Sequence, residues 1–378
     1  MTAARSGSVD HPAEENPFFA PALLTAALDH LADGKVELVL LAGDDDAAIA
    51  LAPIHPTRLG RLVPAVAVWV HSLGPLGTPL LDAGDPDRAA AGLIAAMDGA
   101  APGRRILEFP YLPLAGPIVG TLQLQARLQG RPIAWIGTHQ RAILRRNPGD
   151  GTGLLPAIAP KKRKELARQF RRLAELGSVT TGHTNEPEAV LAALDEFFAL
   201  EASGWKGRRG TALALRPQEK AFAIAAVTEA ARTGDVAIDA IRLDGRAIAM
   251  LISFRAGASA VTWKIAFDEA YARFSPGVHV MLQASERLAG EAGIDCIDSL
   301  AVADHPMVDH LWPDRLEIGT LVIGPKGGSL AYRLGLALAR LEIRARPIVK
   351  NRIREARKLV GTARARLRRS ASSGSPAG

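Results

Sequence analysis

The chain of 378 residues is 48% hydrophobic and 22% charged, with a formal net charge of +7 and one cysteine. This composition excludes a disordered chain, the single cysteine excludes an internal disulfide, and the length suits two domains that each bury a core. The first sixteen residues are polar and acidic, and no run of about 18 residues is apolar throughout, so we expect a cytoplasmic protein without a membrane span.

The first half of the chain predicts alternating helices and strands. Helices are expected over about 21–31, 88–97 and 120–129, and strands over about 36–42, 47–53, 65–71 and 105–109. The acidic turn at 43–46 joins the first two strands into a hairpin. The expected fold class is therefore α/β of the α+β type, with mostly antiparallel sheets flanked by helices.

The Gly-rich segment 148–153 separates the two halves. The second half predicts a basic helix over 160–176, a strand over 179–183, a helix capped by Asn185, a helix over 217–231, strands over 236–243, 247–255 and 261–268, a helix after Gly277 and a strand over 294–301. The basic cluster 161–164 reads as a solvated helix face.

The segment 261–277 carries the main functional prediction. Along its strand, Val261, Trp263, Ile265 and Phe267 alternate with Thr262, Lys264, Ala266 and Asp268, which predicts one packed face and one polar face. Residues 275–278 then form the first turn of an amphipathic helix, where free amides and the helix dipole favour an anion. A phosphate or pyrophosphate would bind Ser275, Gly277 and Val278, with Arg273 as its counter-charge.

Glu201 is the first candidate general base. It falls on the apolar stripe of its predicted helix, and burial makes a carboxylate a better proton acceptor. The alternative is a structural pair with Lys206 or a backbone amide. Trp205 and Lys206 follow in a Gly-rich loop that would either cover a substrate or pack locally.

The order strand, two helices, three antiparallel strands, anion-binding turn, helix and strand is similar to the GNAT acyltransferase fold. The CelD-like branch, associated with cellulose biosynthesis, resembles this chain at 200–207 (LEASGWKG), 210–211, 243–246 (LDGR), 264–277 and 295–298. That branch is similar in turn to the Fem aminoacyl transferases, which carry two GNAT-like halves. The resemblance covers most of 160–323, and the first half only by pattern.

This resemblance implies a degenerate GNAT-like domain at 1–155, a GNAT acyltransferase domain at 156–343 and a basic tail at 344–378. It also implies acetyl-CoA or another acyl-CoA as co-substrate, with the pantetheine held between the strands of Lys264 and Asp298. The chain departs from the family in having one glycine in the pyrophosphate loop, and Met307 and Val308 in place of a Tyr-Lys pair. His305 is the expected replacement for that lysine.

Other site residues remain open between two roles. Tyr271 would protonate the departing thiolate, as a phenol does in many GNAT members, or pack as an aromatic ring. Asp268 would serve as an alternative base or hold its turn, and Asp298 would contact substrate or make a structural hydrogen bond. We predict no metal, because His305, Asp309 and His310 lack the structural context of a metal site.

The positive charge is concentrated at the C-terminus. Residues 344–369 hold eleven basic residues and one acid, a net +10, so the rest of the chain carries −3. Such a tail would lie on anionic lipid, bind a phosphate-rich polymer or stay solvated. No recognisable nucleic-acid module occurs, so no specific nucleic-acid partner is expected.

The expected function is direct acyl transfer from acyl-CoA to an amine or hydroxyl, with small molecules and cell-envelope or polysaccharide precursors as acceptors. One alternative is a non-catalytic GNAT-fold scaffold that docks a synthase at the membrane through the basic tail. Another is a Fem-like transfer from aminoacyl-tRNA, for which the basic cluster at 161–164 offers weak support. The expected location is cytoplasmic. If the basic tail binds the membrane, the protein would lie peripherally at its inner face.

Overall fold

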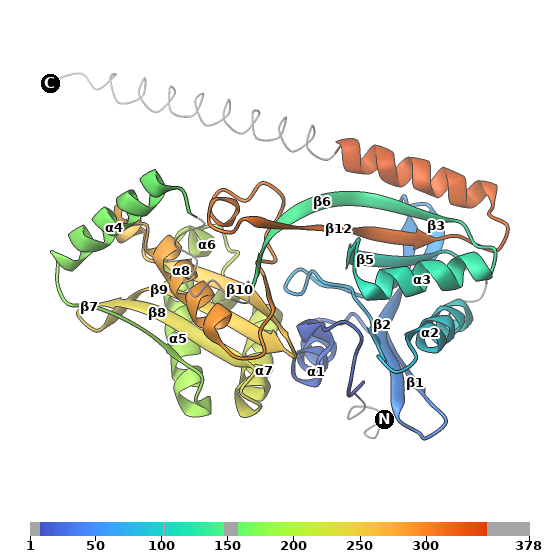
Figure 1. Cartoon of the computed structure of the whole chain (residues 1–378), viewed down its shortest axis with the longest axis horizontal. Helices are drawn as coiled ribbons and strands as arrows, with labels where there is room; N and C mark the ends of the chain where they lie inside the picture. The colour runs from blue at the N-terminus through green and yellow to red at the C-terminus, as the bar shows by residue number, and fades with distance from the viewer. Residues whose placement is uncertain (1–7, 101–102, 104, 147–157, 346–378) are drawn as a thin grey trace, which may run out of the picture.

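The computed structural model describes residues 8–100, 103, 105–146 and 158–345 (Figure 1). The predicted Gly-rich boundary and nearly all of the basic tail lie outside these residues. Within them a 12-stranded sheet runs through the molecule in the order β1-β2-β3-β5-β12-β6-β11-β10-β9-β8-β7, with β4 paired to β2. Most neighbours are antiparallel and helices flank the sheet, which confirms the predicted fold class.

The first half supplies one end of this sheet. Its elements are η2 (Pro17–Phe19), α1 (Pro21–His30), β1 (Glu37–Ala42), β2 (Ala48–Leu59), β3 (Val63–Val68), β4 (Leu80–Leu81), α2 (Pro86–Ala100), β5 (Leu107–Pro113), α3 (Pro117–Leu128) and β6 (Ile133–Arg145). Helices α2 and α3 both begin at a proline, which is pre-organised for the first helical position.

The second half supplies the other end. Its elements are α4 (Pro160–Ala174), β7 (Val179–Thr184), α5 (Pro187–Ser203), α6 (Trp205–Arg208), η4 (Leu213–Leu215), α7 (Pro217–Arg232), β8 (Val236–Leu243), β9 (Arg246–Ala256), β10 (Ser259–Phe267), η5 (Glu269–Phe274), α8 (Pro276–Gly290), β11 (Cys296–Asp298), η6 (Val308–His310) and β12 (Asp314–Ile323). A further helix occupies residues 330–345.

The two halves are joined strand to strand. Strand β12 comes last in the chain, yet it lies between β5 and β6 of the first half and pairs antiparallel with both. On its other side β6 pairs with β11, so that Ile143 lies opposite Asp298. In Figure 1, β6 and β12 run side by side along the top of the molecule and bridge its two ends.

The predicted alternation along 261–268 is wrong. A β-bulge at Trp263 shifts the register of β10 against β9, so Thr262 pairs with Ser253 and Lys264 with Ile252. A bulge inserts one residue and reverses the side-chain faces beyond it. Val261 and Trp263 therefore pack in one core, whereas Ile265 and Phe267 pack against the other.

Two predicted ends of elements are also wrong. Helix α5 has Glu186 rather than Asn185 at its N-cap, and no side chain caps it. Pro187 fixes the first helical turn and keeps the residue before it extended. The strand expected over 294–301 spans only three residues as β11, because Leu300 turns the chain with a φ of 52°.

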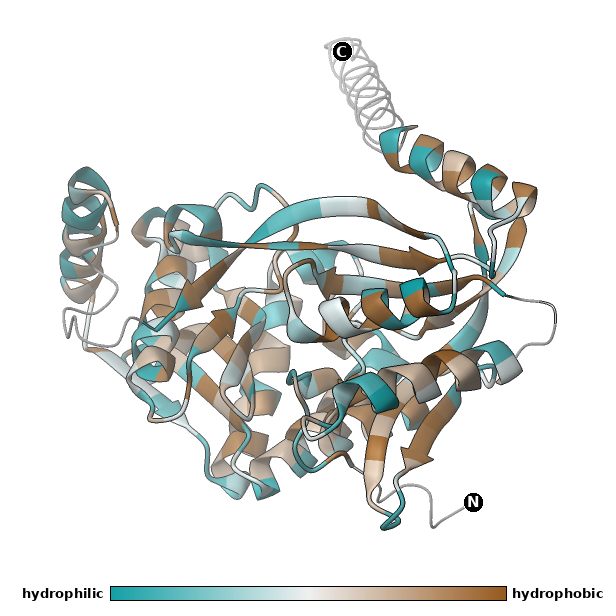
Figure 2. Cartoon of the chain, turned by 45° about the vertical axis from the view of Figure 1, so that its right-hand side comes forward, coloured by the Kyte–Doolittle hydropathy of each residue, from teal (hydrophilic) through white to brown (hydrophobic). Residues whose placement is uncertain are grey.

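Different helices cover the two faces of the sheet. Helices α1, α5 and α7 pack on one face, where α1 of the first half lies against α7 of the second. Helices α4 and α8 contribute to the core on the other face, and Figure 2 shows the buried strands as hydrophobic stretches. The helix 330–345 packs over the β2–β3 end through Tyr332, Leu336 and Ala339. Within the described residues, no helix combines the length and the apolarity needed to cross a bilayer.

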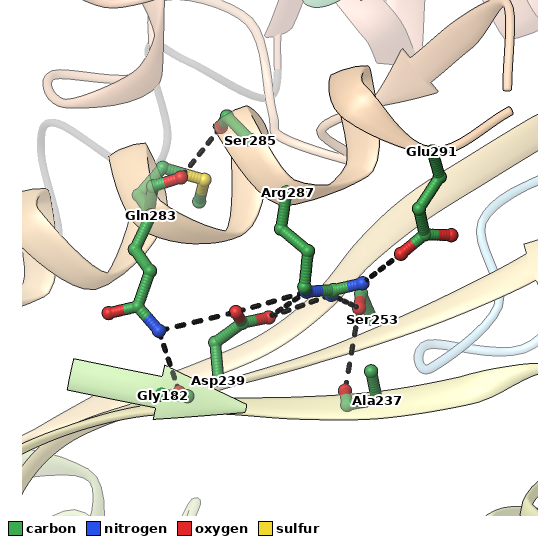
Figure 3. Close-up of polar contacts among 9 residues, drawn as sticks. Gly182, Ala237, Asp239, Ser253, Gln283, Ser285, Arg287 and Glu291 are labelled. Carbon is green, nitrogen blue, oxygen red and sulfur yellow. Dashed lines mark hydrogen bonds and ion pairs between the residues drawn. The ribbon is translucent and has the colours of Figure 1, made fainter. Parts of the chain in front are cut away.

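Helix α8 is fixed to the sheet by a buried ion pair (Figure 3). Arg287 donates to the fully buried carboxylate of Asp239 on β8, at 2.8 Å, and to the hydroxyl of Ser253 on β9, at 2.9 Å. Burial alone would lower the pKa of Arg287, but its bonds and the charges of Asp239 and Glu291 raise it above its ordinary value. This network sets the position of the helix whose first turn is the predicted anion site.

Candidate functional site

The candidate site begins where β10 and β11 part. The two strands pair in parallel only over three residues, from Ser259 opposite Cys296 to Val261 opposite Asp298. Beyond that point β10 continues to Phe267, and no strand of the described residues pairs with it on this side. The edge is contacted instead by side chains: Nζ of Lys206 donates to the carbonyl of Ile265 at 2.9 Å.

Lys264 lies on this free part of β10. Its ammonium is 5.6 Å from the ring centre of Trp263 and has no hydrogen bond or ion pair with any described residue. Burial, and then the positive charge of Lys206, lowers the pKa of Lys264 to about 8, although the charge of Glu201 acts in the opposite direction. A lysine with a lowered pKa and no partner is typical of a functional position.

Glu201 has the partners of a structural carboxylate. Its Oε1 accepts from Nζ of Lys206 at 2.7 Å, and its Oε2 accepts from the backbone N–H of Leu213 at 2.7 Å. The side chain is almost fully buried in α5. Both carboxylate oxygens therefore have hydrogen-bond partners, as in the predicted alternative in which Glu201 is a structural residue. Glu201 can act as a base only if Lys206 leaves Oε1.

Asp268 holds the turn that follows β10. Its Oδ1 accepts from the backbone N–H of Ala270 at 3.0 Å, which caps η5, and its Oδ2 pairs with Arg246 at 2.9 Å. Tyr271 lies in η5, half-buried beside the core, and no described residue bonds its hydroxyl. Of these two, Tyr271 has the free functional group.

The first turn of α8 has a specific backbone geometry. Ser275 adopts the left-handed conformation with a φ of 53°, and its carbonyl accepts from Val278 at 2.9 Å and His279 at 3.2 Å. Pro276 has no N–H, and the Ser275 amide donates to Ala272. The Gly277 amide is left without an acceptor among the described residues, so the turn offers fewer free donors than predicted.

Positive side chains surround this turn. Arg273 is exposed, stacks 4.7 Å from the ring centre of Phe274 and pairs with no carboxylate among the described residues. Helix α4 packs beside it, with Phe170 5.1 Å from the ring of His279. Burial, with the nearby charge of Lys162 as a further cause, lowers the pKa of His279 to about 4, despite a backbone hydrogen bond at Phe274 that raises it.

The start of α2, which lies in sequence between the parallel neighbours β3 and β5 as α8 lies between β10 and β11, has the opposite character. The carboxylate of Asp82 accepts from the amides of Gly84 at 3.0 Å and Asp85 at 3.2 Å, just before α2 begins. Asp85 in turn accepts from the amide of Arg88 at 3.0 Å. At the start of α2, acidic side chains therefore already accept from the amides that could bind an anion. The first turn of α8 holds no acidic side chain.

The remaining predicted residues are spread around the site. Asp298 forms an ion pair with the buried guanidinium of Arg141 on β6 and accepts from the amide of Leu300 at 2.9 Å. Nδ1 of His305 accepts from the amides of Met307 and Val308, at 3.3 and 3.4 Å, and so holds its own loop.

Trp205 is exposed at the start of α6. Its ring lies 5.0 Å from the guanidinium of Arg209, and its amide donates to Glu269 at 3.1 Å.

Taken together, the predicted residues form two groups. Glu201, Lys206 and Lys264 lie together midway along β10, while Arg273 and Gly277 lie at its far end. No described group of three His, Cys, Asp or Glu side chains could hold a metal.

Sequence reasoning missed His71 and Arg141, both at the seam between the halves. His71 follows β3 and packs against Trp69 and Phe222, and burial, then the charge of Lys264, lowers its pKa to about 4. Arg141 is 1% exposed and directly precedes the apolar run Ala142-Ile143-Leu144, and a cation beside such a run was the signal that the sequence offered. No pattern in the sequence marks His71, because its contacts come from distant segments.

Residues 160–305 match the family model described as an acetyltransferase (GNAT) domain. The match runs from α4 past β11 and includes Glu201, Lys264, Arg273 and Asp298. These residues thus form a GNAT acyltransferase domain, and the protein is an acyltransferase. No curated protein matches the sequence.

Solved structures are similar over more than this domain. The C-terminal domain of a putative lysylphosphatidylglycerol synthetase from Agrobacterium fabrum has a TM-score of 0.51 and 14% identity, over 81% of this chain and 88% of that chain. A conserved protein of unknown function from Bacteroides thetaiotaomicron has a TM-score of 0.50 and 13% identity, over 85% and 94%. FemX has a TM-score of 0.49 and 12% identity, over 76% and 88%. The first two similarities show a shared fold.

Proposed function

We propose that the second half transfers an acyl group directly from an acyl-CoA thioester, with acetyl-CoA the simplest donor, to an amine or hydroxyl. The observation that carries this proposal is the first turn of α8. Among the described residues, the Gly277 amide has no acceptor, Arg273 pairs with no carboxylate and the turn holds no acidic residue, and these features favour a diphosphate. At the start of α2, Asp82 already accepts from the backbone amides. This supports a single donor site in the chain, at α8, and a first half that no longer binds a donor.

The donor would run from α8 along the free edge of β10. Its thioester would then lie near the bulge at Trp263, where the ammonium of Lys264, which has no hydrogen bond or ion pair with a described residue, would stabilise negative charge developing on the carbonyl oxygen. Tyr271, whose hydroxyl no described residue bonds, would protonate the departing thiolate. Lys206 bonds the edge at Ile265, so donor binding would displace that contact.

Asp268 and Glu201 are the proposed proton acceptors for the attacking group, and each must first lose a bond that it makes here.

The proposed domains are 1–155, 156–343 and a basic tail at 344–378, with β12 completing the sheet of the first half. The CelD-like relationship, and with it a polysaccharide or envelope precursor as acceptor, is proposed from the motifs at 200–207 and 243–246.

A turnover assay tests the proposed reaction. Purified protein is incubated with acetyl-CoA and a panel of amines and alcohols, and the free thiol of CoA is measured. We expect thiol release that depends on an acceptor and falls in Lys264→Met. If folded protein releases no CoA thiol with any acceptor, that result would contradict transfer from acetyl-CoA.

The second candidate function is transfer from aminoacyl-tRNA. The basic side chains of α4 favour this function, because they are exposed beside the first turn of α8 and extend along the roughly 22 Å length of α4. These are Lys161, Lys162, Lys164, Arg168, Arg171 and Arg172. Thiol release from acetyl-CoA separates the two functions, since an aminoacyl-tRNA donor leaves no thiol.

We also propose an anionic membrane surface as a partner, which would place the protein at the inner face of a membrane. Opposite its buried side, the helix 330–345 exposes Leu330 (82%), Leu334 (54%) and Leu341 (64%) on one stripe. Arg333 and Arg340 flank this stripe, and the charge of +10 follows in sequence. An outward apolar stripe beside basic residues is typical of a helix that lies on anionic lipid.

A further inference from the structure

A cavity of about 410 Å³ lies at the seam between the two halves. Three parts of the chain line it: the segment after β3, the strands β5, β6 and β12, and the segment after β11. The lining residues are Val70, His71, Ser72, Pro75, Tyr111, His139, Arg141, Leu300, Ala301, Val302 and Ile318. Cavities of this size accommodate small molecules.

Several polar groups of the lining lack partners. Among the described residues, the buried Nε of Arg141 has no hydrogen bond, although the other guanidinium nitrogens bond Asp298 and the carbonyl of Pro75. The buried Nδ1 of His71 likewise has no described partner, and the exposed residues Ser72 and Tyr111 add hydroxyls that no described residue bonds. Because a buried polar atom without a hydrogen bond is costly, Nε of Arg141 and Nδ1 of His71 point to a ligand that bonds them.

The lining does not suit a charged ligand. The charge of Arg141 is compensated by Asp298, whose other oxygen accepts from Leu300. An anion would therefore compete with Asp298, and a cation would find no free carboxylate among the lining residues. Burial first, and then the charge of Lys264, lowers the pKa of His71 to about 4, so this ring is neutral near pH 7.

The Nε of Arg141, which no described residue bonds, decides between an amine and a hydroxyl, because an ammonium only donates and would leave this donor unbonded, whereas a hydroxyl oxygen can accept from it. The nearby charge of Lys264, which acts on His71, acts in the same direction. A protonated amine is therefore disfavoured there, whereas a hydroxyl carries no charge to repel. The proposed donor edge of β10 joins the same region, because Nε1 of Trp263 donates to the carbonyl of Leu73 at 2.7 Å in the lining loop.

We propose that the seam cavity is the acceptor pocket and that it takes a neutral, hydroxyl-rich molecule of sugar-like chemistry, which is acylated on oxygen. This inference rests on the proposed acyl-CoA function and narrows its acceptor. In the reaction a hydroxyl oxygen attacks the thioester carbon, the C–O bond forms and the C–S bond breaks. The hydroxyl proton is released and the thiolate takes up a proton, which gives an ester and free CoA without an oxidant.

A matched pair of sugars tests the choice of chemistry. Glucose and glucosamine differ at one position, where glucosamine carries an amine that is protonated near pH 7. Binding of each to the full-length protein is followed by saturation-transfer NMR, and the products formed with acetyl-CoA by mass spectrometry. We expect saturable binding of glucose, binding of glucosamine weaker by about tenfold, and an O-acetyl product. Equal or tighter glucosamine binding, N-acetylation or no binding of either sugar overturns the proposal.

A variant at the rim tests the place of binding. Val302 lines the cavity but is 71% exposed, so Val302→Trp fills the mouth without disturbing a core. Leu62→Trp is the matched control, because Leu62 is 61% exposed and belongs to the β2–β3 turn. Glucose binding should be lost in the first variant and kept in the second. Glucose binding that survives Val302→Trp overturns the assignment of this cavity.

Failure of the pocket and failure of the donor site give different results. Calorimetry with acetyl-CoA is run on both variants, and the donor should bind each as it binds the unmodified protein. If the unmodified protein binds acetyl-CoA but no sugar, the pocket proposal fails and the function stands. If it does not bind acetyl-CoA, the function itself fails, whatever the sugar result.

Discussion

Nζ of Lys206 lies 2.7 Å from Oε1 of Glu201 and also donates to the carbonyl of Ile265, so one ammonium ties α5 to the edge of β10. The α5–α6 corner thereby closes over the strand edge that would receive the donor. Donor binding and this bridge compete for the same carbonyl.

The first prediction concerns Glu201→Gln, which keeps the shape of the side chain but removes its charge. We expect a loss of about 2 to 3 kcal/mol in the free energy of unfolding, because Lys206 and the Leu213 amide lose a charged acceptor. Urea denaturation measures this loss. Asp195→Asn, an exposed site on the same helix, is the control. An unchanged free energy of unfolding would show that the bridge does not form in solution.

Lys264 predicts a pH dependence of stability. Its pKa is about 8 in the folded protein and 10.5 ordinarily, so between these values the unfolded chain binds more protons and stability rises with pH. We expect a rise of roughly 1 to 3 kcal/mol between pH 8 and 10.5, measured by urea denaturation. Lys264→Met should remove it. A rise that persists in Lys264→Met would assign the effect to another group.

The same residue predicts a pH dependence of turnover. If the charged ammonium stabilises the thioester oxygen, kcat should fall as the pH rises through about 8. Lys264→Arg keeps its charge in this range, so its profile should lose that falling limb. An unchanged limb in Lys264→Arg would exclude Lys264 as its source.

The Asp239–Arg287 pair in Figure 3 predicts a large loss of stability on removal of one partner. Asp239→Asn removes the fully buried counter-charge of Arg287 and leaves it only the partly exposed Glu291, so the free energy of unfolding should drop by about 3 to 5 kcal/mol. Thermal or urea denaturation checks this value. Asp235→Asn, whose carboxylate is 3.8 Å from Arg255 near the surface, should change it by less than about 1 kcal/mol. Similar losses in both variants would contradict the role given to the buried pair.

The fold was largely predictable because local rules fix it. The Asp244-Gly245 turn, the prolines at helix starts and the apolar stripe of α5 each specify an element, and the structure has those elements. The bulge at Trp263 was not predictable, because it depends on how β9 and β10 pair and on the bond from Trp263 to Leu73. That single insertion moved Ile265 and Phe267 to the other face.

The candidate site was predictable only where one segment carries it. Arg273, Ser275 and Gly277 lie within one turn, so a helix-start argument found them. His71 and Arg141 come together only through the pairing of β6 with β11 and the loop after β3, which no local pattern encodes. The partners of Glu201 and Asp298 were likewise decided by tertiary contacts.

The leucine stripe predicts membrane binding that depends on both apolar and charged groups. The triple variant Leu330→Ser, Leu334→Ser, Leu341→Ser should reduce cosedimentation of the full chain with phosphatidylglycerol vesicles by about tenfold. Leu124→Ser with Leu128→Ser, exposed leucines of α3, is the control. Salt should weaken binding, and neutral phosphatidylcholine vesicles should bind little. Equal binding by the triple variant would rule out this helix as the contact.

Titration of acetyl-CoA into the full-length protein, followed by calorimetry, tests the central claim most directly. We predict saturable binding at one site per chain, weakened about tenfold in Arg273→Gln and unchanged in Arg58→Gln, an exposed arginine of β2. Folded protein that takes up no acetyl-CoA, or that binds it equally well in Arg273→Gln, would contradict a donor site at the first turn of α8.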